Sequence, residues 1–330
     1  MPGLVPGIHV LAALMKEDVD GRDKPGHDEY DNNFVDGNMS SSTRPTLIGF
    51  TAILMWSLLA LLTAASGKVP PFQLAAMTFA IGGLLGAMSW MFRKGAAAAL
   101  RQPPEVWALG IFGLFGYHAL YFFALRLAPP AESGLINYLW PLLIVLFSAF
   151  LPGEKLKLHH IAGALIGLVG TIVLVMGRAQ IGFAPEFIPG YCAAFVAAFV
   201  WAIYSVLSRR FAAVPTDAVA GFCLATAILG AIFHLIFETT VWPASSVEWL
   251  AVLALGLGPV GAAFYVWDIG MKRGDIRFLG AASYAAPVLS TIFLVLAGYA
   301  EATVPLALAA ALIAGGGLIA AKDMIVRRKR

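Results

Sequence analysis

The stretch PAESGLINYLWPLLIVLFSAF, residues 130–150, decides the fold class of this chain. The hydrocarbon core of a bilayer is about 30 Å thick and an α-helix rises about 1.5 Å per residue, so a spanning helix needs about 20 largely apolar residues. This stretch has that length and character. Nine similar stretches lie around it, separated by short links that contain Pro, Gly or charged residues. We therefore expect ten transmembrane helices, near residues 45–64, 70–92, 104–125, 130–150, 157–177, 188–207, 215–237, 247–270, 276–298 and 303–321.

The composition leads to the same conclusion. Of the 330 residues, 60% are hydrophobic and only 12% are charged, so the chain has too few polar residues to cover a soluble globule of this size. We therefore expect most of its surface to face lipid. The predicted fold class is an all-α polytopic membrane protein, and the predicted location is the inner membrane of a bacterium.

The number of lysine and arginine residues alternates between high and low from one link to the next. Cytoplasmic loops of membrane proteins carry the excess of these residues. If the N-terminus lies inside, the inner links hold 16 of them and the outer links hold only three, namely Lys68, Arg126 and Arg178. Adding or removing one helix midway would destroy this alternation. The distribution therefore supports ten helices with both chain ends in the cytoplasm.

Residues 1–44 differ from the rest of the chain. The segment from Lys16 to Asp31 is charged, contains Gly and Pro and has few apolar residues, so we expect a disordered leader. The apolar run before it is too short to span a bilayer and lacks a small-residue cleavage site, which argues against a signal peptide. Met39 lies just before the first predicted helix and is an alternative start. Residues 322–330 form a basic tail that is expected in the cytoplasm.

The chain contains an internal repeat with a nearly constant offset. Chance could produce any single pair in so biased a composition, but a shared offset across three predicted helices is harder to produce. The recurring residues are Tyr138 and Pro141, found again as Tyr284 and Pro287 after 146 residues; Glu154 and Gly170, found again as Glu301 and Gly317 after 147; and Trp56, found again as Trp201 after 145.

The repeat predicts two five-helix units, residues 45–187 and 188–321. Because five is odd, the second unit must enter the membrane from the opposite side, so the two units are inverted relative to each other. Inverted repeats are a common basis of alternating access, in which the substrate site lies near the midplane between the halves.

Small residues spaced four apart predict close helix packing. Such residues let helix backbones approach each other in a membrane. We expect close contacts at Gly82 and Gly86, at Gly163 and Gly167, and along 315–317. The two cysteines, Cys192 and Cys223, fall inside predicted helices rather than in outer loops, so we interpret both as small packing residues.

Polar aromatic residues gather in the interior of several predicted helices. An indole N–H that faces lipid would lack a hydrogen-bond partner, so such residues need an internal cavity or a neighbouring acceptor. The alternative is that these aromatic residues only fill a large core. As a set they predict a polar-edged aromatic cavity, with candidate substrate-binding residues Trp56, Tyr117, His118, Tyr121, Asn137, Tyr138, Trp140, Trp201, Tyr204, Trp267 and Tyr284.

Two further kinds of residue are candidates for movement or gating. Pro141 and Pro287 each lack the N–H that would bond one turn back, so they predict kinks at equivalent places in the two units. Asp268 lies four residues before Lys272, which predicts an ion pair or a gate contact in preference to a proton-coupling site. His118 could orient a substrate carboxylate or could bond a neighbouring helix.

The charges also restrict the substrate. No Lys or Arg lies in the middle of a predicted helix, whereas a phosphorylated solute favours a buried cation. A neutral or zwitterionic solute with an apolar side chain suits an aromatic cavity better. The sequence predicts no cofactor, no metal, no nucleic-acid partner and no obligate protein partner.

The residues above resemble the drug/metabolite transporter superfamily, in its EamA-type branch. The resemblance covers residues 45–321 and rests on the two five-helix units, on Trp56 and Trp201, on Pro-Gly-Glu at 152–154 and on Glu301. Within that branch, GYHALY at 116–121 and INYLWP at 136–141 resemble exporters of aromatic amino acids.

The resemblance implies export of aromatic and other neutral amino acids by alternating access. It also implies that Trp56, Tyr117, His118, Tyr121, Tyr138, Trp140, Trp201 and Trp267 line the central cavity. Efflux of drugs or other small metabolites is the alternative within transport. An intramembrane enzyme is disfavoured because the sequence lacks Gly-x-Gly-Asp, His-Glu-x-x-His and a Gly-x-Ser motif with an evident His partner.

Overall fold

The computed structural model describes residues 42–93, 95–179, 181–298 and 300–323, and these residues fold as helices without any strand. The leader and Met39 lie outside the described residues, as does most of the predicted basic tail. Nine helical segments of the described chain are long and apolar enough to cross a membrane. A further apolar helix, α16 (Val304–Ala320), has 17 residues.

The candidate spans follow the predicted boundaries closely. Four of them are single helices: α4 (Pro71–Ser89), α9 (Leu158–Met176), α10 (Ile188–Arg210) and α11 (Ala218–Phe237). Five are built from two helices that follow each other directly: α2 (Thr43–Trp56) with α3 (Leu59–Ala65), α5 (Pro104–Ile111) with α6 (Tyr117–Leu127), α7 (Pro130–Asn137) with α8 (Trp140–Phe147), α12 (Ser246–Leu257) with α13 (Ala263–Arg273), and α14 (Ile276–Ala282) with α15 (Ala285–Leu296).

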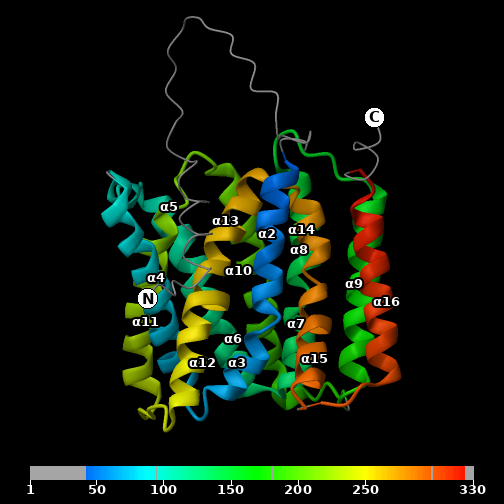
Figure 1. Cartoon of the computed structure of the whole chain (residues 1–330). Helices are drawn as coiled ribbons and strands as arrows, with labels where there is room; N and C mark the ends of the chain where they lie inside the picture. The colour runs from blue at the N-terminus through cyan, green and yellow to red at the C-terminus, as the bar shows by residue number, and fades with distance from the viewer. Residues whose placement is uncertain (1–41, 94, 180, 299, 324–330) are drawn as a thin grey trace, which may run out of the picture.

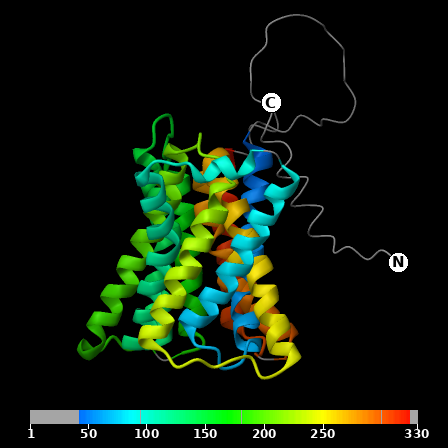
Figure 2. The same ribbon diagram turned by 90° about the vertical axis from the view of Figure 1, so that its left-hand side faces the viewer.

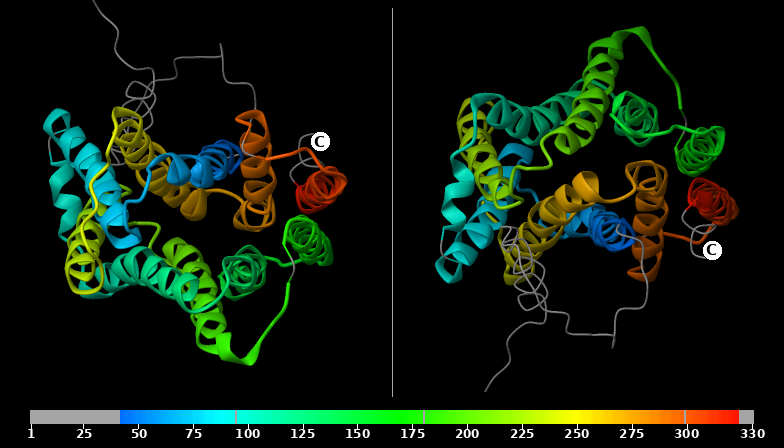
Figure 3. Two further views of the ribbon diagram at one scale, coloured as in Figure 1. Left: turned by 90° about the horizontal axis from the view of Figure 1, so that it is seen from below. Right: turned by 90° about the horizontal axis from the view of Figure 1, so that it is seen from above.

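The helices form two facing rows that are closed at both ends (Figure 3). One row holds α2/α3, α12/α13 and α14/α15, and the other holds α5/α6, α7/α8 and α10. At one end α4 packs against α11, which Figure 2 shows towards the viewer. At the other end α9 packs against α16 (Figure 1). A helix pair therefore closes each end of the two rows.

Several of the spans are interrupted along their length. The helix breaks at Ser57–Leu58, at Tyr138–Leu139 and at Ser283–Tyr284. The last two breaks lie just before Pro141 and Pro287, where the missing proline N–H prevents a continuous bond pattern. Two π-helical turns, η3 (Phe112–Gly116) and η6 (Gly258–Ala262), join α5 to α6 and α12 to α13, and they begin 146 residues apart.

Close contacts occur at five of the seven predicted glycines, and at three of them, Gly82, Gly163 and Gly316, the nearest atom belongs to a neighbouring backbone. A Cβ on Gly82 would lie 2.6 Å from the Cα of Gly261, and a Cβ on Gly163 would lie 2.5 Å from the carbonyl oxygen of Gly316. The prediction is wrong for the two neighbours of Gly316, because a Cβ on Gly315 or Gly317 would meet nothing within 4 Å. Only the middle residue of the three faces α9.

The two cysteines differ in their surroundings. Both lie in helices and are free thiols, but Cys223 is fully buried whereas Cys192 is exposed. The interpretation as a packing residue therefore applies to Cys223 and is wrong for Cys192.

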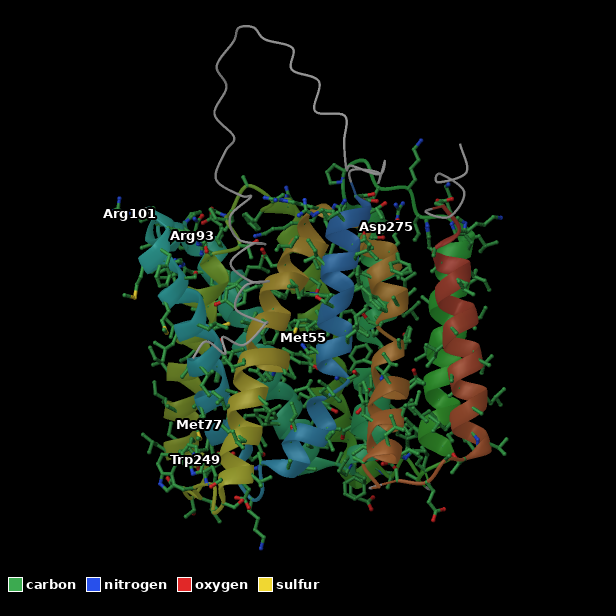
Figure 4. All side chains as sticks on the ribbon, in the orientation of Figure 1. Met55, Met77, Arg93, Arg101, Trp249 and Asp275 are labelled. Atoms are coloured by element: carbon green, nitrogen blue, oxygen red, sulfur yellow. The ribbon has the colours of Figure 1, made fainter. Side chains whose placement is uncertain are left out.

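The end of the bundle where the described chain begins and ends carries most of the charged contacts, and we call it the terminal face. Arg93, Arg101 and Asp275 lie towards it, whereas Met77 and Trp249 lie towards the opposite face (Figure 4). The terminal face is crosslinked by ion pairs between distant segments: Arg93 with Asp217, Arg209 with Glu154, Arg277 with Glu154, and Lys157 with Asp323.

We expect Asp323 to make the stability of this face sensitive to acid. The Lys157 ammonium, 2.8 Å from the Asp323 carboxylate, donates a hydrogen bond that holds the pKa of Asp323 below its ordinary 3.8. A carboxyl whose pKa is lowered by folding stabilises the protein above the unfolded-state pKa, and loses this contribution as pH falls through the folded-state pKa.

The melting temperature of Asp323→Asn should therefore lie below that of the parent protein at neutral pH, and the two should converge at pH values below 3.8. Glu105→Gln, which changes an exposed acid on α5, is the matched control. A difference between Asp323→Asn and the parent that stays constant down to the lowest pH would contradict this account.

Candidate functional site

Four tryptophan rings meet between the two rows of helices. Trp56 lies at the end of α2, Trp140 at the start of α8, Trp201 in α10 and Trp267 in α13. The ring centroid of Trp56 lies 5.0 Å from that of Trp267, 5.6 Å from that of Trp201 and 6.3 Å from that of Trp140. The remaining three pairs lie at 6.2 to 6.3 Å. Every pair is within the range of edge-to-face or offset ring contact, so the four rings form one tryptophan cluster.

Two of these indoles have a hydrogen-bond acceptor on another helical segment, one on the backbone and one on a side chain. The Nε1–H of Trp56 donates to the carbonyl oxygen of Pro259 at 3.0 Å, inside the π-helical turn η6. The Nε1–H of Trp267 donates to the hydroxyl of Ser205 at 3.1 Å. Within the described chain, no protein acceptor lies in reach of the indole N–H of Trp140 or Trp201. These two donors are therefore available to a solute.

A polar aromatic group adjoins the tryptophan cluster. The ring of Tyr117 lies 5.3 Å from that of Trp201 and stacks on Tyr121, one helical turn later, at 6.1 Å. Asn137 donates from Nδ2 to the hydroxyl of Tyr117 at 3.0 Å, while its buried Oδ1 atom has no hydrogen-bond partner. Such an unmatched buried acceptor is costly and points to a ligand donor. Tyr117, Tyr121 and Tyr138 are only partly buried.

In the part of the chain that the structure describes, His118 does not bond a neighbouring helix, contrary to one of the two expectations for it. Its Nδ1 lies 2.7 Å from the carbonyl oxygen of Leu114, in the π-helical turn of its own span. Because a carbonyl only accepts, Nδ1 carries the proton in the neutral ring and Nε2 is left as an acceptor. The ring packs against Phe79 at 5.0 Å and Phe264 at 6.1 Å. The described contacts therefore hold His118 between its own helix and the rings of Phe79 and Phe264.

The structure separates Tyr284 from the other predicted residues. Tyr284 is fully buried in a second cluster between α8, α9 and α16, where its ring lies against Gly167. Tyr138 packs on the edge of this second cluster. Tyr204 lies behind Trp201, with ring centroids 5.3 Å apart, and is almost inaccessible.

Asp268 and Lys272 form an ion pair on the side of the tryptophan cluster that faces the terminal face. The Lys272 ammonium lies 2.8 Å from Asp268 Oδ2 and donates to the carbonyl oxygen of Val214 at 2.8 Å. Thr216 donates to the same Asp268 oxygen at 2.7 Å. The pair thus attaches the link between α10 and α11 to α13. Its charges are satisfied inside the protein.

The sequence did not point to Phe79 and Phe264. Phe264 contacts Trp56 at 6.2 Å, Trp201 at 5.9 Å and Phe79 at 5.3 Å. Its position three residues before Trp267 in one helix was an available signal, because residues three apart share a face. Phenylalanine is so common in this chain that its type alone carried no information.

One group of potential metal ligands lies outside this region. His159, His160 and Asp323 gather at the terminal face. However, Asp323 is paired with Lys157, and the backbone N–H of Lys157 donates to His160 Nδ1 at 3.2 Å. A cationic neighbour and a used imidazole lone pair fit an ion-paired helix start better than a metal centre.

A bundle of apolar helices around an enclosed aromatic and polar site defines a membrane transport protein. The chain belongs to the EamA-like transporter family, whose sequence model matches residues 44–176 and again residues 188–322. It is 62% identical over 289 residues, 87% of this chain and 100% of the relative, to the aromatic amino acid exporter YddG of Ancylobacter novellus.

More distant relatives and a solved structure agree with this assignment. The chain is 29% identical to the aromatic amino acid exporter YddG of Salmonella typhimurium, over 76% of this chain and 87% of the relative. It is 28% identical to the pseudopaline exporter CntI of Pseudomonas aeruginosa, over 60% of this chain and 68% of the relative. A crystal structure with 62% identity superposes with a TM-score of 0.83, covering 88% of this chain and all of that chain.

Proposed function

We propose that this chain exports aromatic and other neutral amino acids across the inner membrane, through a central chamber that forms at the tryptophan cluster between the two rows. The observation that carries the proposal is the tryptophan cluster bordered by Tyr117 and Asn137, in a chain that is similar over 87% of its length to a protein named as an aromatic amino acid exporter. Amino acid export suits both the apolar ring surface and the unmatched polar atoms beside it.

The chamber offers a matching group for each part of a zwitterionic substrate. The tryptophan faces take an aromatic side chain, and a cation over an indole or phenol ring is stabilised by about 0.5–2 kcal/mol. The unpartnered Oδ1 of Asn137 accepts from the ammonium group. The indole N–H groups of Trp140 and Trp201 and the hydroxyl groups of Tyr121 and Tyr138 are donors for the carboxylate.

The proposed substrate contacts are therefore Trp56, Tyr117, Tyr121, Asn137, Tyr138, Trp140 and Trp201. Tyr204 and Trp267 position the rings in front of them, since both are almost inaccessible. His118 holds its place through the Leu114 carbonyl. Tyr284 does not contact the substrate but affects the site indirectly, because it packs α9 against the break before α15.

The proposal includes a ten-helix architecture of two inverted five-helix units, residues 45–187 and 188–321, with the terminal face in the cytoplasm. Two observations support it: the family model matches the chain twice, and the π-helical turns begin 146 residues apart. The breaks before Pro141 and Pro287 are the proposed flexible points. The excess of Lys and Arg in the links at the terminal face supports the orientation.

The direct test is uptake of labelled phenylalanine into proteoliposomes, with and without a proton gradient. We expect saturable uptake, and a fall of roughly tenfold or more in kcat/KM for Trp140→Ala, because loss of an aromatic contact of 1–2 kcal/mol has about that effect. Trp242→Ala, which changes an exposed ring near the opposite face, is the matched control.

The alternative of drug or other metabolite efflux gives a different result. A carrier of lipophilic cations would transport a cationic dye without competition from phenylalanine or tryptophan. Dye transport that is indifferent to both amino acids, together with no phenylalanine uptake, would reject amino acid export and leave the family assignment intact.

A further inference from the structure

A three-residue charge cluster joins the two rows of helices at the terminal face. Glu154 follows α8, Arg209 ends α10 and Arg277 lies in α14. Glu154 contacts Arg209 at 2.8 Å and Arg277 at 3.3 Å through its two carboxylate oxygens. The three side chains are between 13% and 24% exposed, so water screens their attraction only in part.

Both arginines also bond backbone carbonyls of the opposite row. Arg209, on α10, donates to the carbonyl oxygens of Met271 at 3.1 Å and Gly274 at 2.7 Å, at the end of α13. Arg277, on α14, donates to the carbonyl oxygen of Lys155 at 2.9 Å, just after α8. Glu154 and Arg209 lie on the same row, but the Glu154–Arg277 ion pair and the backbone hydrogen bonds of both arginines cross between the rows. The rows therefore cannot separate at this face while these contacts are intact.

The cluster lines a cavity of about 390 Å³ that opens at the terminal face. Water in this cavity can replace the hydrogen bonds of the three side chains when they part. A contact of this kind can be broken and remade, whereas the fully buried pair of Asp268 and Lys272 has no such access.

Among the described residues, the charged contacts at the opposite face have another arrangement, because Glu238 lies 3.9 Å from Arg126 and 3.0 Å from His234 and accepts from the start of α4, so that this group joins α6, α11 and α4. The repeat pairs Glu154 with Glu301, which is exposed and makes no hydrogen bond or ion pair with any residue that the structure describes. The residues 145–147 positions before Arg209 are Leu62, Thr63 and Ala64, and those before Arg277 are Pro130, Ala131 and Glu132. None of these side chains is a cation, so Glu301 cannot find the same partners when the opposite face closes.

We infer that Glu154, Arg209 and Arg277 form a charge clamp that holds the terminal face closed, and that this one-sided clamp makes the closed terminal face the resting state. Each transport cycle must then open the clamp before a solute can enter or leave through this face. The inference rests on the proposed function only in assuming that the rows separate there. Its test needs no substrate, so it can fail while amino acid export stands, or hold while amino acid export fails.

The test measures the distance between spin labels at Leu47→Cys on α2 and Lys155→Cys after α8, two exposed positions on opposite rows at the terminal face. The background carries Cys192→Ser, because Cys192 is exposed while the fully buried Cys223 does not label. We expect one short distance for the intact clamp. Glu154→Gln and Arg277→Gln should each raise the ratio of a longer to the short distance about tenfold, as expected for loss of roughly 1.4 kcal/mol.

Two matched variants make the outcome decisive. Glu105→Gln removes an exposed acid elsewhere at the terminal face and should leave the distances unchanged. Arg277→Lys keeps the positive charge and should retain the short distance. If Glu154→Gln does not fold, the comparison of spin-label distances between Arg277→Gln and Arg277→Lys is sufficient to test the inference. Unchanged distances in Arg277→Gln, or equal lengthening in Arg277→Gln and Arg277→Lys, would overturn the inference.

Discussion

Replacing Trp201 by alanine is expected to lower the free energy of unfolding by about 3–5 kcal/mol and to reduce phenylalanine transport at least about a hundredfold. Trp201 is 3% exposed. Its ring contacts six others at centroid distances from 5.3 to 6.3 Å, including Trp56 from the opposite row and Tyr117 from its own. No neighbour can fill the space it leaves without giving up its own contacts, because these rings hold one another in place.

Thermal unfolding in detergent and uptake into proteoliposomes check this prediction together. Trp201→Phe keeps a ring in the site and should retain most of the stability while losing the indole donor. Trp242→Ala is the control for loss of a tryptophan as such, since Trp242 is 62% exposed and stacks on Trp249 alone among the described rings. A Trp201→Ala protein with parental stability and parental transport would contradict the central role of the cluster.

Alanine at Gly316 is expected to destabilise the protein by about 1–3 kcal/mol, whereas alanine at Gly315 or Gly317 should stabilise it by about 0.5–1 kcal/mol. A Cβ on Gly316 would lie 2.6 Å from the carbonyl oxygen of Gly163 and 3.1 Å from the backbone nitrogen of Gly167. Both are backbone atoms of α9, so they can move only if the whole helix moves. The Cβ atoms of the two neighbours would meet nothing within 4 Å, so the helix preference of alanine acts alone there.

Opposite signs at adjacent residues distinguish packing from helix propensity. Melting temperatures of the three single variants, measured in one detergent, provide the comparison. Gly163→Ala tests the same contact from the other helix, because its Cβ would lie 2.5 Å from the Gly316 carbonyl oxygen. Stabilisation by all three changes on α16 would show that α9 and α16 are not in close contact.

The sequence was sufficient for the positions of the spans and for recognising aromatic residues inside them. Apolar length is a property of the chain in one dimension, since the bilayer thickness sets it. For this reason the predicted stretches agree with nine candidate spans and with α16. The interior aromatic residues could also be recognised, because indole and phenol groups inside an apolar helix need partners.

Only the tertiary structure decided which of these side chains meet. The π-helical turn at 112–116 inserts one residue into a helix that turns about 100° per residue, so a face counted from the start of α5 no longer holds in α6. His118 bonds Leu114 in its own span, and its ring contacts Phe79 and Phe264. Tyr138 and Tyr284, at the breaks before α8 and α15, lie respectively against and inside the second cluster.

The sequence likewise could not show which glycines and which charged residues make contacts. Three consecutive glycines on α16 are equivalent in the sequence, yet only Gly316 faces α9, because helix rotation selects one residue in three or four for a contact. Glu154, Arg209 and Arg277 lie up to 123 residues apart in the chain and meet only because α8, α10 and α14 end at one face. The bilayer dictates where this chain crosses, and the rotation and interruption of each helix dictate what it presents to its neighbours.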